Sequence, residues 1–138
     1  MATGAIAGLI AITPASGYVG ILGSLGIGAA SSVICFFTVT NFKARTGIDD
    51  TLDVFALHGV GGLVGTVLVP VFALSAIAPV TASIWTNAVG AVAVQAYSPV
   101  MTAGILLVVK VAVGLRVDDK AERLGLDITQ HGEMIAPN

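Results

Sequence analysis

A single histidine, His58, lies in the longest uncharged stretch of the chain and is the residue best placed to do chemistry. No Lys, Arg, Asp or Glu occurs between Asp53 and Lys110. An imidazole in hydrocarbon is costly unless it has a hydrogen-bond partner or a function. We expect burial to favour the uncharged ring, in which one nitrogen donates and the other accepts. Such a ring can bind a small polar molecule or pass a proton, and an interhelical hydrogen bond is an equally weighted alternative.

A metal site around His58 is not expected. A metal ion needs several ligands, and Cys35, on another apolar segment, is the only other ligand type at a plausible depth. Because it is also the only cysteine, the chain has no intrachain disulfide. We interpret Cys35 as a small buried hydrophobe, and no cofactor is predicted.

Composition places the chain in a membrane. The hydrophobic fraction is 56%, the charged fraction is 10% and the mean hydropathy is +0.97, whereas soluble domains have about 25% charged residues. The formal net charge of -2 provides no basic surface, so nucleic acid is not an expected partner. The apolar start of the chain lacks the basic residues of a secretory signal, so we interpret it as membrane helix.

Four apolar segments, separated by helix breakers, form a predicted transmembrane part over residues 1–113. A full crossing needs about 20 residues. The first segment is too short, so we expect it either to continue upstream of Met1 or to be re-entrant. The fourth is longer than a crossing needs, which predicts a tilt, a kink near Pro99 or an extension beyond the bilayer. The predicted spans are residues 2–12, 20–42, 50–72 and 81–113.

The distribution of basic residues predicts the orientation. Lys43 and Arg45 lie between the second and third spans, and further Lys and Arg residues follow the fourth. The two opposite loops, residues 14–19 and 74–80, contain neither. By the positive-inside rule, residues 114–138 form a cytoplasmic tail on a multi-pass protein of the cell (inner or plasma) membrane.

Small residues predict how the spans meet. Gly61 and Gly65 form a GxxxG pair next to His58, and such pairs let helix backbones approach closely in lipid. We therefore expect an all-α, polytopic membrane helix bundle with tight crossings.

An acidic cluster precedes the third span and sets the depth of His58. Asp49 or Asp50 is expected to cap this helix, where a carboxylate meets free N–H groups and the positive end of the helix dipole. His58 follows Asp50 by eight residues, about 12 Å along a helix, which places it near the bilayer midplane. Asp53 is expected to bond loop or helix-end amides.

Residues 49–65 resemble the DDxxDVFxxHGVxGxxG signature of the ammonium transporter family. Two further segments are similar to family motifs in the same order: residues 4–18, with the run Ala11-Ile12-Thr13-Pro14-Ala15-Ser16-Gly17-Tyr18, and the tail from Val113 to Glu133. Three ordered motifs with suitable spacing make the resemblance specific.

This resemblance implies an eleven-helix protomer built from two inverted halves, usually assembled as a homotrimer with one pore through each protomer. The chain would supply the last four helices, starting inside the eighth. A histidine from each half meets in the pore, and His58 matches that of the second half. The first-half histidine and the aromatic gate have no counterpart in this sequence.

The implied activity is transport and not enzymatic catalysis. Ammonium would be recruited outside and lose its proton, and ammonia would pass through an apolar channel lined by His58. Val54 and Ile6 match apolar pore-lining positions, with helix packing as the alternative. Thr13 would lie in the external vestibule, although a threonine before proline also suits a helix end.

The resemblance also assigns a regulatory role to the tail. The matching segment couples subunits in the family, and trimeric nitrogen-signalling proteins of the PII class dock on the cytoplasmic face of many members. A solvated tail is the alternative, and His131 is expected to be exposed and unrelated to conduction. The charged residues in the matching stretch are Arg116, Glu122, Arg123 and Asp127.

Two other functions remain open for the chain by itself. It could be a truncated membrane interaction subunit without transport activity of its own. It could also form a small homo-oligomeric channel in which several copies each contribute His58. An upstream reading frame encoding another half with its own histidine would favour the complete transporter.

Overall fold

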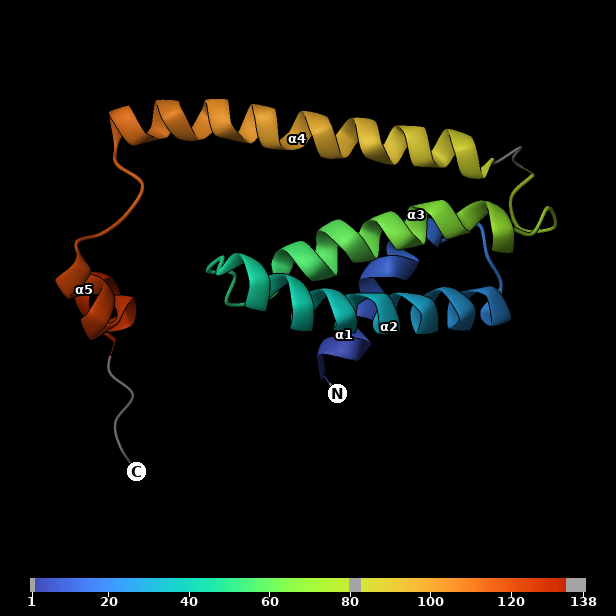
Figure 1. Cartoon of the computed structure of the whole chain (residues 1–138), viewed down its shortest axis with the longest axis horizontal. Helices are drawn as coiled ribbons and strands as arrows, with labels where there is room; N and C mark the ends of the chain where they lie inside the picture. Colours follow the sequence, from blue (N-terminus) through green and yellow to red (C-terminus); the bar gives the residue numbers. More distant parts are fainter. Residues whose placement is uncertain (1, 80–82, 134–138) are drawn as a thin grey trace. The chain divides into compact units, whose positions relative to one another are not determined.

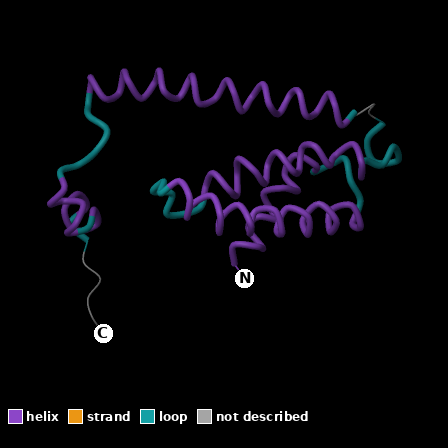
Figure 2. The backbone as a smooth tube through the Cα atoms, viewed as in Figure 1, coloured by secondary structure: helices purple, strands orange, loops and turns teal. Residues whose placement is uncertain are grey.

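The computed structural model describes residues 2–79 and 83–133, and its regular elements in these ranges are helices (Figure 2). The chain divides into two units, residues 1–96 and 97–138, and α4 begins in the first and ends in the second. A 3-10 turn (Thr13–Ala15) and two π turns (Phe55–Val60 and Asp127–His131) supplement the α-helices. These are α1 (Ala2–Ile12), α2 (Ile21–Thr46), α3 (Gly61–Phe72), α4 (Ile84–Ala112) and α5 (Asp119–Leu124).

Three helical segments of the described ranges are long and apolar enough to cross a membrane: Ile21–Thr46, Phe55–Phe72 and Ile84–Ala112. The apolar helix at Thr3–Ala15 is shorter. The all-α membrane helix bundle predicted from composition and spacing is therefore confirmed. The eleven-helix protomer and the division at residue 113 stay predictions.

Helices α1, α2 and α3 pack on one another through small residues (Figure 1). Where α1 crosses α2, a Cβ built at Gly8 would lie 3.6 Å from the Cα of Gly28. At the α1–α3 crossing, a Cβ at Gly65 would lie 2.9 Å from the carbonyl carbon of Ala11. That separation is too short for a side-chain carbon, so Gly65 allows the two backbones to touch.

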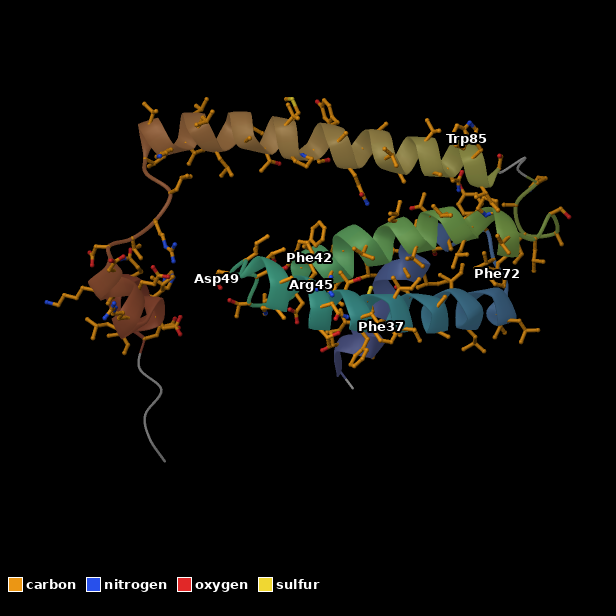
Figure 3. All side chains as sticks on the ribbon, in the orientation of Figure 1. Phe37, Phe42, Arg45, Asp49, Phe72 and Trp85 are labelled. Carbon is orange, nitrogen blue, oxygen red and sulfur yellow. The ribbon has the colours of Figure 1, made fainter. Side chains whose placement is uncertain are left out.

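The apolar core of this bundle has two buried clusters. One joins Ala11, Ala15, Ile27 and Val69, and Phe72 packs against it. Phe72 ends α3 beside the start of α2 (Figure 3), where a Cβ at Gly26 would lie 3.1 Å from its ring. The second cluster comprises Ala7, Cys35 and Leu57, with Ile10 packed against it.

The loop before α2 is bound to the end of α3. Val19 and Ala73 form an isolated antiparallel bridge, and the Leu74 amide donates to the Tyr18 carbonyl at 2.9 Å. The two loops without Lys or Arg therefore lie at the same end of the α2–α3 pair, as a pair of antiparallel helices requires.

Helix α2 extends beyond the expected end at Phe42 and stops at Thr46. Gly47 adopts a left-handed conformation (φ 63°), and its amide donates to the Lys43 carbonyl at 3.1 Å. Lys43 and Arg45 therefore lie in the last turn, where the negative end of the helix dipole favours cations. From the sequence, these two residues were expected in the turn after the helix, because their charges interrupt the apolar pattern of the span.

The third span begins later than the predicted residue 50. Asp50 stands outside the helix and accepts hydrogen bonds from the Val54 and Phe55 amides at 2.8 and 2.9 Å. The helix then opens with the π turn Phe55–Val60 and continues as α3. The residues before it form a loop in which Asp53 has a positive φ of 55°.

Two prolines lie inside helices instead of ending them. Pro70 lies within α3 and has no amide hydrogen for the Thr66 carbonyl. The Asn87 side chain donates to that carbonyl at 2.8 Å, which removes an unsatisfied group that would be costly in lipid. Helix α4 likewise continues through Pro99. Its predicted first residues, 81 and 82, lie outside the described ranges.

Candidate functional site

The π turn Phe55–Val60 decides which side chains face the core. Ala56 and Leu57 are buried, whereas His58 is exposed. A π turn contains one residue more than an α-helical turn, and such turns occur often at functional sites. On this turn the consecutive residues Leu57 and His58 thus face the core and the outside of the bundle, respectively.

His58 lies in the wall of an open recess of about 520 Å³ within the first unit. The wall is mostly apolar, and the His58 ring makes no hydrogen bond to any other described residue. Three segments form the wall of the recess: the end of α1 with its 3-10 turn, the π turn with α3, and the first half of α4. The other lining residues are Ile10, Thr13, Pro14, Gly59, Gly62, Leu63, Thr66, Ala91, Val94 and Gln95.

The other side-chain donors around the recess are bound to backbone carbonyls. Thr13 Oγ1 donates to the Leu9 carbonyl at 3.0 Å, and Thr66 Oγ1 donates to the Gly62 carbonyl at 2.9 Å. Gln95 Nε2 donates to the Gly59 carbonyl at 3.0 Å. His58 is thus the titratable group that faces this recess, and its ring nitrogens can donate to or accept from a small polar molecule.

The structure brings together some of the residues predicted to line the pore. His58 and Thr13 both line the recess, and their roles in a pore stay predictions. Val54 and Ile6 do not line it; both are about half exposed, at 49% and 46%. Ile10, one turn after Ile6, takes the apolar position on the wall.

The three aspartates before the π turn have three different roles. Asp50 is the helix cap, and the amides of Phe55 and Val54 lower the pKa of its carboxyl, with a smaller contribution from the charge of Lys43. Asp49 accepts a hydrogen bond from the Thr51 hydroxyl at 3.3 Å. Of the two aspartates first considered as caps, Asp50 is the one that binds helix-end amides.

Asp53 differs from its expected role. Its carboxylate pairs with the Lys43 ammonium at 3.0 Å and so joins the end of α2 to the start of the third span. Its carbonyl, and not its side chain, accepts the Leu57 amide at 2.9 Å. Figure 3 labels Arg45 and Asp49 in the same polar region, at the end of α2 and in the loop that follows.

The tail contains a bidentate ion pair. The Arg116 guanidinium donates to both carboxylate oxygens of Glu122, at 2.6 and 3.0 Å. This hydrogen bonding lowers the pKa of the Glu122 carboxyl. Asp118, which the sequence reasoning missed, caps α5 by accepting the Ala121 amide at 2.8 Å.

The other tail residues singled out in the sequence lie in α5 and in the second π turn. Arg123 lies in the last turn of the short helix α5, and Asp127 begins the second π turn. His131 ends that turn. The structure thus pairs Arg116 with Glu122 and places Arg123 with Glu122 around one recess, while Asp127 lies in the π turn that follows.

Sequence reasoning missed two polar side chains that bind carbonyls of the third span, one in α3 and one in the π turn before it. Asn87 and Gln95 are eight residues apart on α4, in an otherwise apolar stretch. Since a polar side chain in a membrane span needs a partner, both could have been singled out from the sequence. Their acceptors could not, because those depend on which helix lies opposite.

These elements define the class as a multi-pass helical membrane protein with a histidine in an apolar recess. The profile of the Ammonium Transporter Family matches residues 1–136. The chain therefore belongs to the ammonium transporter family, and the resemblance inferred from its motifs is confirmed.

Individual relatives agree with this assignment. An ammonium transporter of Aquifex aeolicus is 45% identical over 96% of this chain and 33% of its own length. One of Bacillus subtilis is 38% identical over 95% of this chain and 35% of its own length. The crystal structure of Candida albicans Mep2 matches with a TM-score of 0.73 and 35% identity, over 86% of this chain and 29% of that one. The chain spans about a third of the length of these curated relatives.

Proposed function

We propose that the chain forms the His58-bearing wall of an ammonium-conducting pore. The observation that carries the proposal is the position of His58 on an apolar recess, with no hydrogen bond from its ring to another described residue. A neutral imidazole in such a wall offers ammonia one donor and one acceptor. The charged ammonium ion would have to be desolvated to enter the same space, which is costly.

In this mechanism ammonium loses its proton before or at the histidine and crosses the apolar segment as ammonia. His58 bonds to the passing molecule, and Thr13, at the end of the first helical segment, contributes to the mouth of the recess. Ile10 and Leu63 contribute apolar side chains to the wall. A second histidine, from residues not in this chain, would complete the proton path.

We further propose the surroundings in which this wall acts. The complete protein would be a homotrimer of eleven-helix protomers, with the present residues as the last four helices and the tail in the cytoplasm. The tail, with Arg116, Glu122, Arg123 and Asp127, would receive a PII-class regulator. The basic residues at the end of α2 support this orientation, because Lys43 and Arg45 lie opposite the two uncharged loops.

The test is uptake of radiolabelled methylammonium by cells that lack their own ammonium transporters and express the complete protomer containing these residues. His58→Ala should lower uptake at least about tenfold, equivalent to about 1.4 kcal/mol. His131→Ala, the matched change at the other histidine, should leave uptake unchanged. Equal uptake by wild type and His58→Ala, at equal amounts of assembled protein, would exclude His58 from the path.

Expression of the 138-residue chain alone separates the other functions. Uptake by the chain alone that is lost in His58→Ala would indicate a small homo-oligomeric channel. A chain that conducts neither alone nor with the upstream residues, yet associates with another membrane protein, would be an interaction subunit.

A further inference from the structure

Two small polar residues on α2, Ser31 and Cys35, lie one turn apart and are completely buried. Their exposed fractions are 0% and 1%, which are among the lowest of the described residues. Neither lines the recess that contains His58. Buried polar groups in a membrane bundle require hydrogen-bond partners. The contacts of Ser31 and Cys35 reach the π turn that carries His58.

The contacts form a chain across three helical segments. Ser31 Oγ donates to the Ala7 carbonyl of α1 at 3.2 Å and lies 3.6 Å from Cys35 Sγ. Cys35 Sγ donates to the Ala56 carbonyl at 3.2 Å. Each side chain has one hydrogen to donate, and both hydrogens are thus used on backbone carbonyls.

The acceptor at the end of this chain belongs to the π turn. Ala56 is the second residue of Phe55–Val60, and its carbonyl also receives the Gly61 amide in a π-type hydrogen bond over five residues; the same amide is shared with the His58 carbonyl. A carbonyl oxygen has two lone pairs, so the thiol and the amide can bind it together. The thiol therefore adds a bond to the carbonyl on which the π geometry depends.

Gly61 provides the space for these contacts. A Cβ at this position would lie 3.2 Å from Cys35 Sγ and 3.3 Å from Ser31 Oγ. The glycine that follows the π turn therefore lets the two α2 side chains reach the backbone of the third span. The glycine spacing around His58 thus serves a polar contact as well as helix packing.

The register of the π turn determines the direction of His58. Removing the extra residue of a π turn rotates the preceding residues relative to the following helix by about 100°. Leu57 packs with Ala7 and Cys35 in the core, while His58 faces the recess. A rotation of this size would move the imidazole along the wall and away from its present direction.

We propose that Cys35, with Ser31 packed beside its thiol, is a positioning residue, which holds the π turn in register through the Ala56 carbonyl and thereby directs His58 into the recess. This role rests on the proposed pore function of His58. The positioning of His58 can be tested without measuring transport. Failure of the positioning role is therefore distinguishable from failure of the proposed pore function.

The first test measures the S–H infrared stretch of the 138-residue chain in bicelles. Cys35 is the only cysteine, so its band is unobstructed by other thiols. A thiol that donates to a carbonyl should absorb at lower frequency than one in hydrocarbon solvent. A band at the free-thiol frequency in the wild type would overturn the proposal whatever the variants do.

The second test follows the two histidine side chains by ¹⁵N NMR. Cys35→Ala removes the donor and should shift the His58 signals while leaving those of His131 unchanged. Cys35→Ser restores a donor and should return the His58 signals toward their wild-type positions. Ile27→Ala, at a fully buried α2 residue in the other core cluster, is the control for lost packing and should not shift His58.

Unchanged His58 signals in Cys35→Ala, or an equal shift in Ile27→Ala, would contradict a positioning role. In the complete transporter we expect Cys35→Ala to lower the maximal uptake rate about threefold, the equivalent of the roughly 0.6 kcal/mol typical of a hydrogen bond between membrane helices. Cys35→Ser should recover most of that rate. If the spectra change as expected but uptake does not, the positioning stands and the pore role of His58 fails.

Discussion

The bundle of α1, α2 and α3 differs from α4 in burial, although all these helices are strongly apolar. α2 and α3 have buried residues, including Ile27, Cys35 and Val69, whereas α4 has none among its described residues. In the bundle, glycines mark backbone contacts; on the part of α4 that belongs to the first unit, no described atom lies within 4 Å of a Cβ built at Gly90. Hydropathy therefore places a helix in the membrane, while small residues matched across a crossing determine whether two helix backbones touch.

The largest expected effect comes from filling a bundle contact. Gly65→Ala would place a Cβ against the Ala11 backbone, so we expect the free energy of unfolding to fall by about 1–3 kcal/mol. Gly90→Ala, at a position of α4 in the first unit where a Cβ meets no described atom, is the matched control and should not lower it, because alanine favours a helix over glycine by about 1 kcal/mol. Loss of helical circular dichroism during SDS titration of the reconstituted chain measures both. Equal effects would remove the distinction between the two regions.

A smaller effect should come from removing a buried hydroxyl. Ser31→Ala deletes the hydrogen bond from α2 to the Ala7 carbonyl, which should lower the free energy of unfolding by about 0.6 kcal/mol and at most about 1.7 kcal/mol. Ser24→Ala is the matched control, because the Ser24 hydroxyl bonds within its own helix, to Ile21. The same titration compares them. A loss in Ser24→Ala as large as in Ser31→Ala would indicate that contacts between helices do not decide the stability of the bundle.

The acidic cap of the third span should make the free energy of unfolding depend on pH, and only in the acidic range. The folded-state pKa of Asp50 is lowered by the Phe55 and Val54 amides, so its contribution is complete above the unfolded pKa, near 4. It is lost as the pH falls through the lower folded-state pKa. Asp50→Asn should therefore be less stable than wild type at pH 7, and the difference should shrink below about pH 4.

Asp49→Asn is the control for this cap, because Asp49 bonds to Thr51 and not to the helix amides. Unfolding titrations of both variants at neutral and acidic pH provide the measurement. A difference between wild type and Asp50→Asn that is the same at all pH values would show that the charge of the cap is irrelevant.

The smallest expected effect lies in the tail, outside the bundle. Hydrogen bonding from Arg116 lowers the pKa of Glu122, so Arg116→Gln should raise this pKa toward the ordinary value for glutamate. NMR titration of the side-chain carboxyl measures the change, and added salt should reduce it, because the pair is exposed. Arg123→Gln is the control and should leave the Glu122 pKa nearly unchanged. Stability of the bundle should not respond to either variant.

Much of the fold could be predicted from the sequence because its signals are local. Apolar length predicted the second, third and fourth spans, and the acidic cluster predicted a cap that the structure places at Asp50. Helix ends were predicted less accurately. Lys43 and Arg45 belong to α2, because the helix ends only at Gly47, which adopts a left-handed conformation. The ion pair of Asp53 was not predicted, because its partner, Lys43, lies on a neighbouring helix.

The sequence by itself determined that this chain is a set of membrane helices of the ammonium transporter family, because hydropathy and ordered motifs can be read residue by residue. Only the tertiary structure decided which groups surround His58 and how its turn is held. The π turn, the Cys35 contact with Ala56 and the approach of Gly65 to Ala11 depend on which helix faces are opposed. A crossing brings together residues distant in sequence, and neither hydropathy nor spacing along one helix specifies its partner.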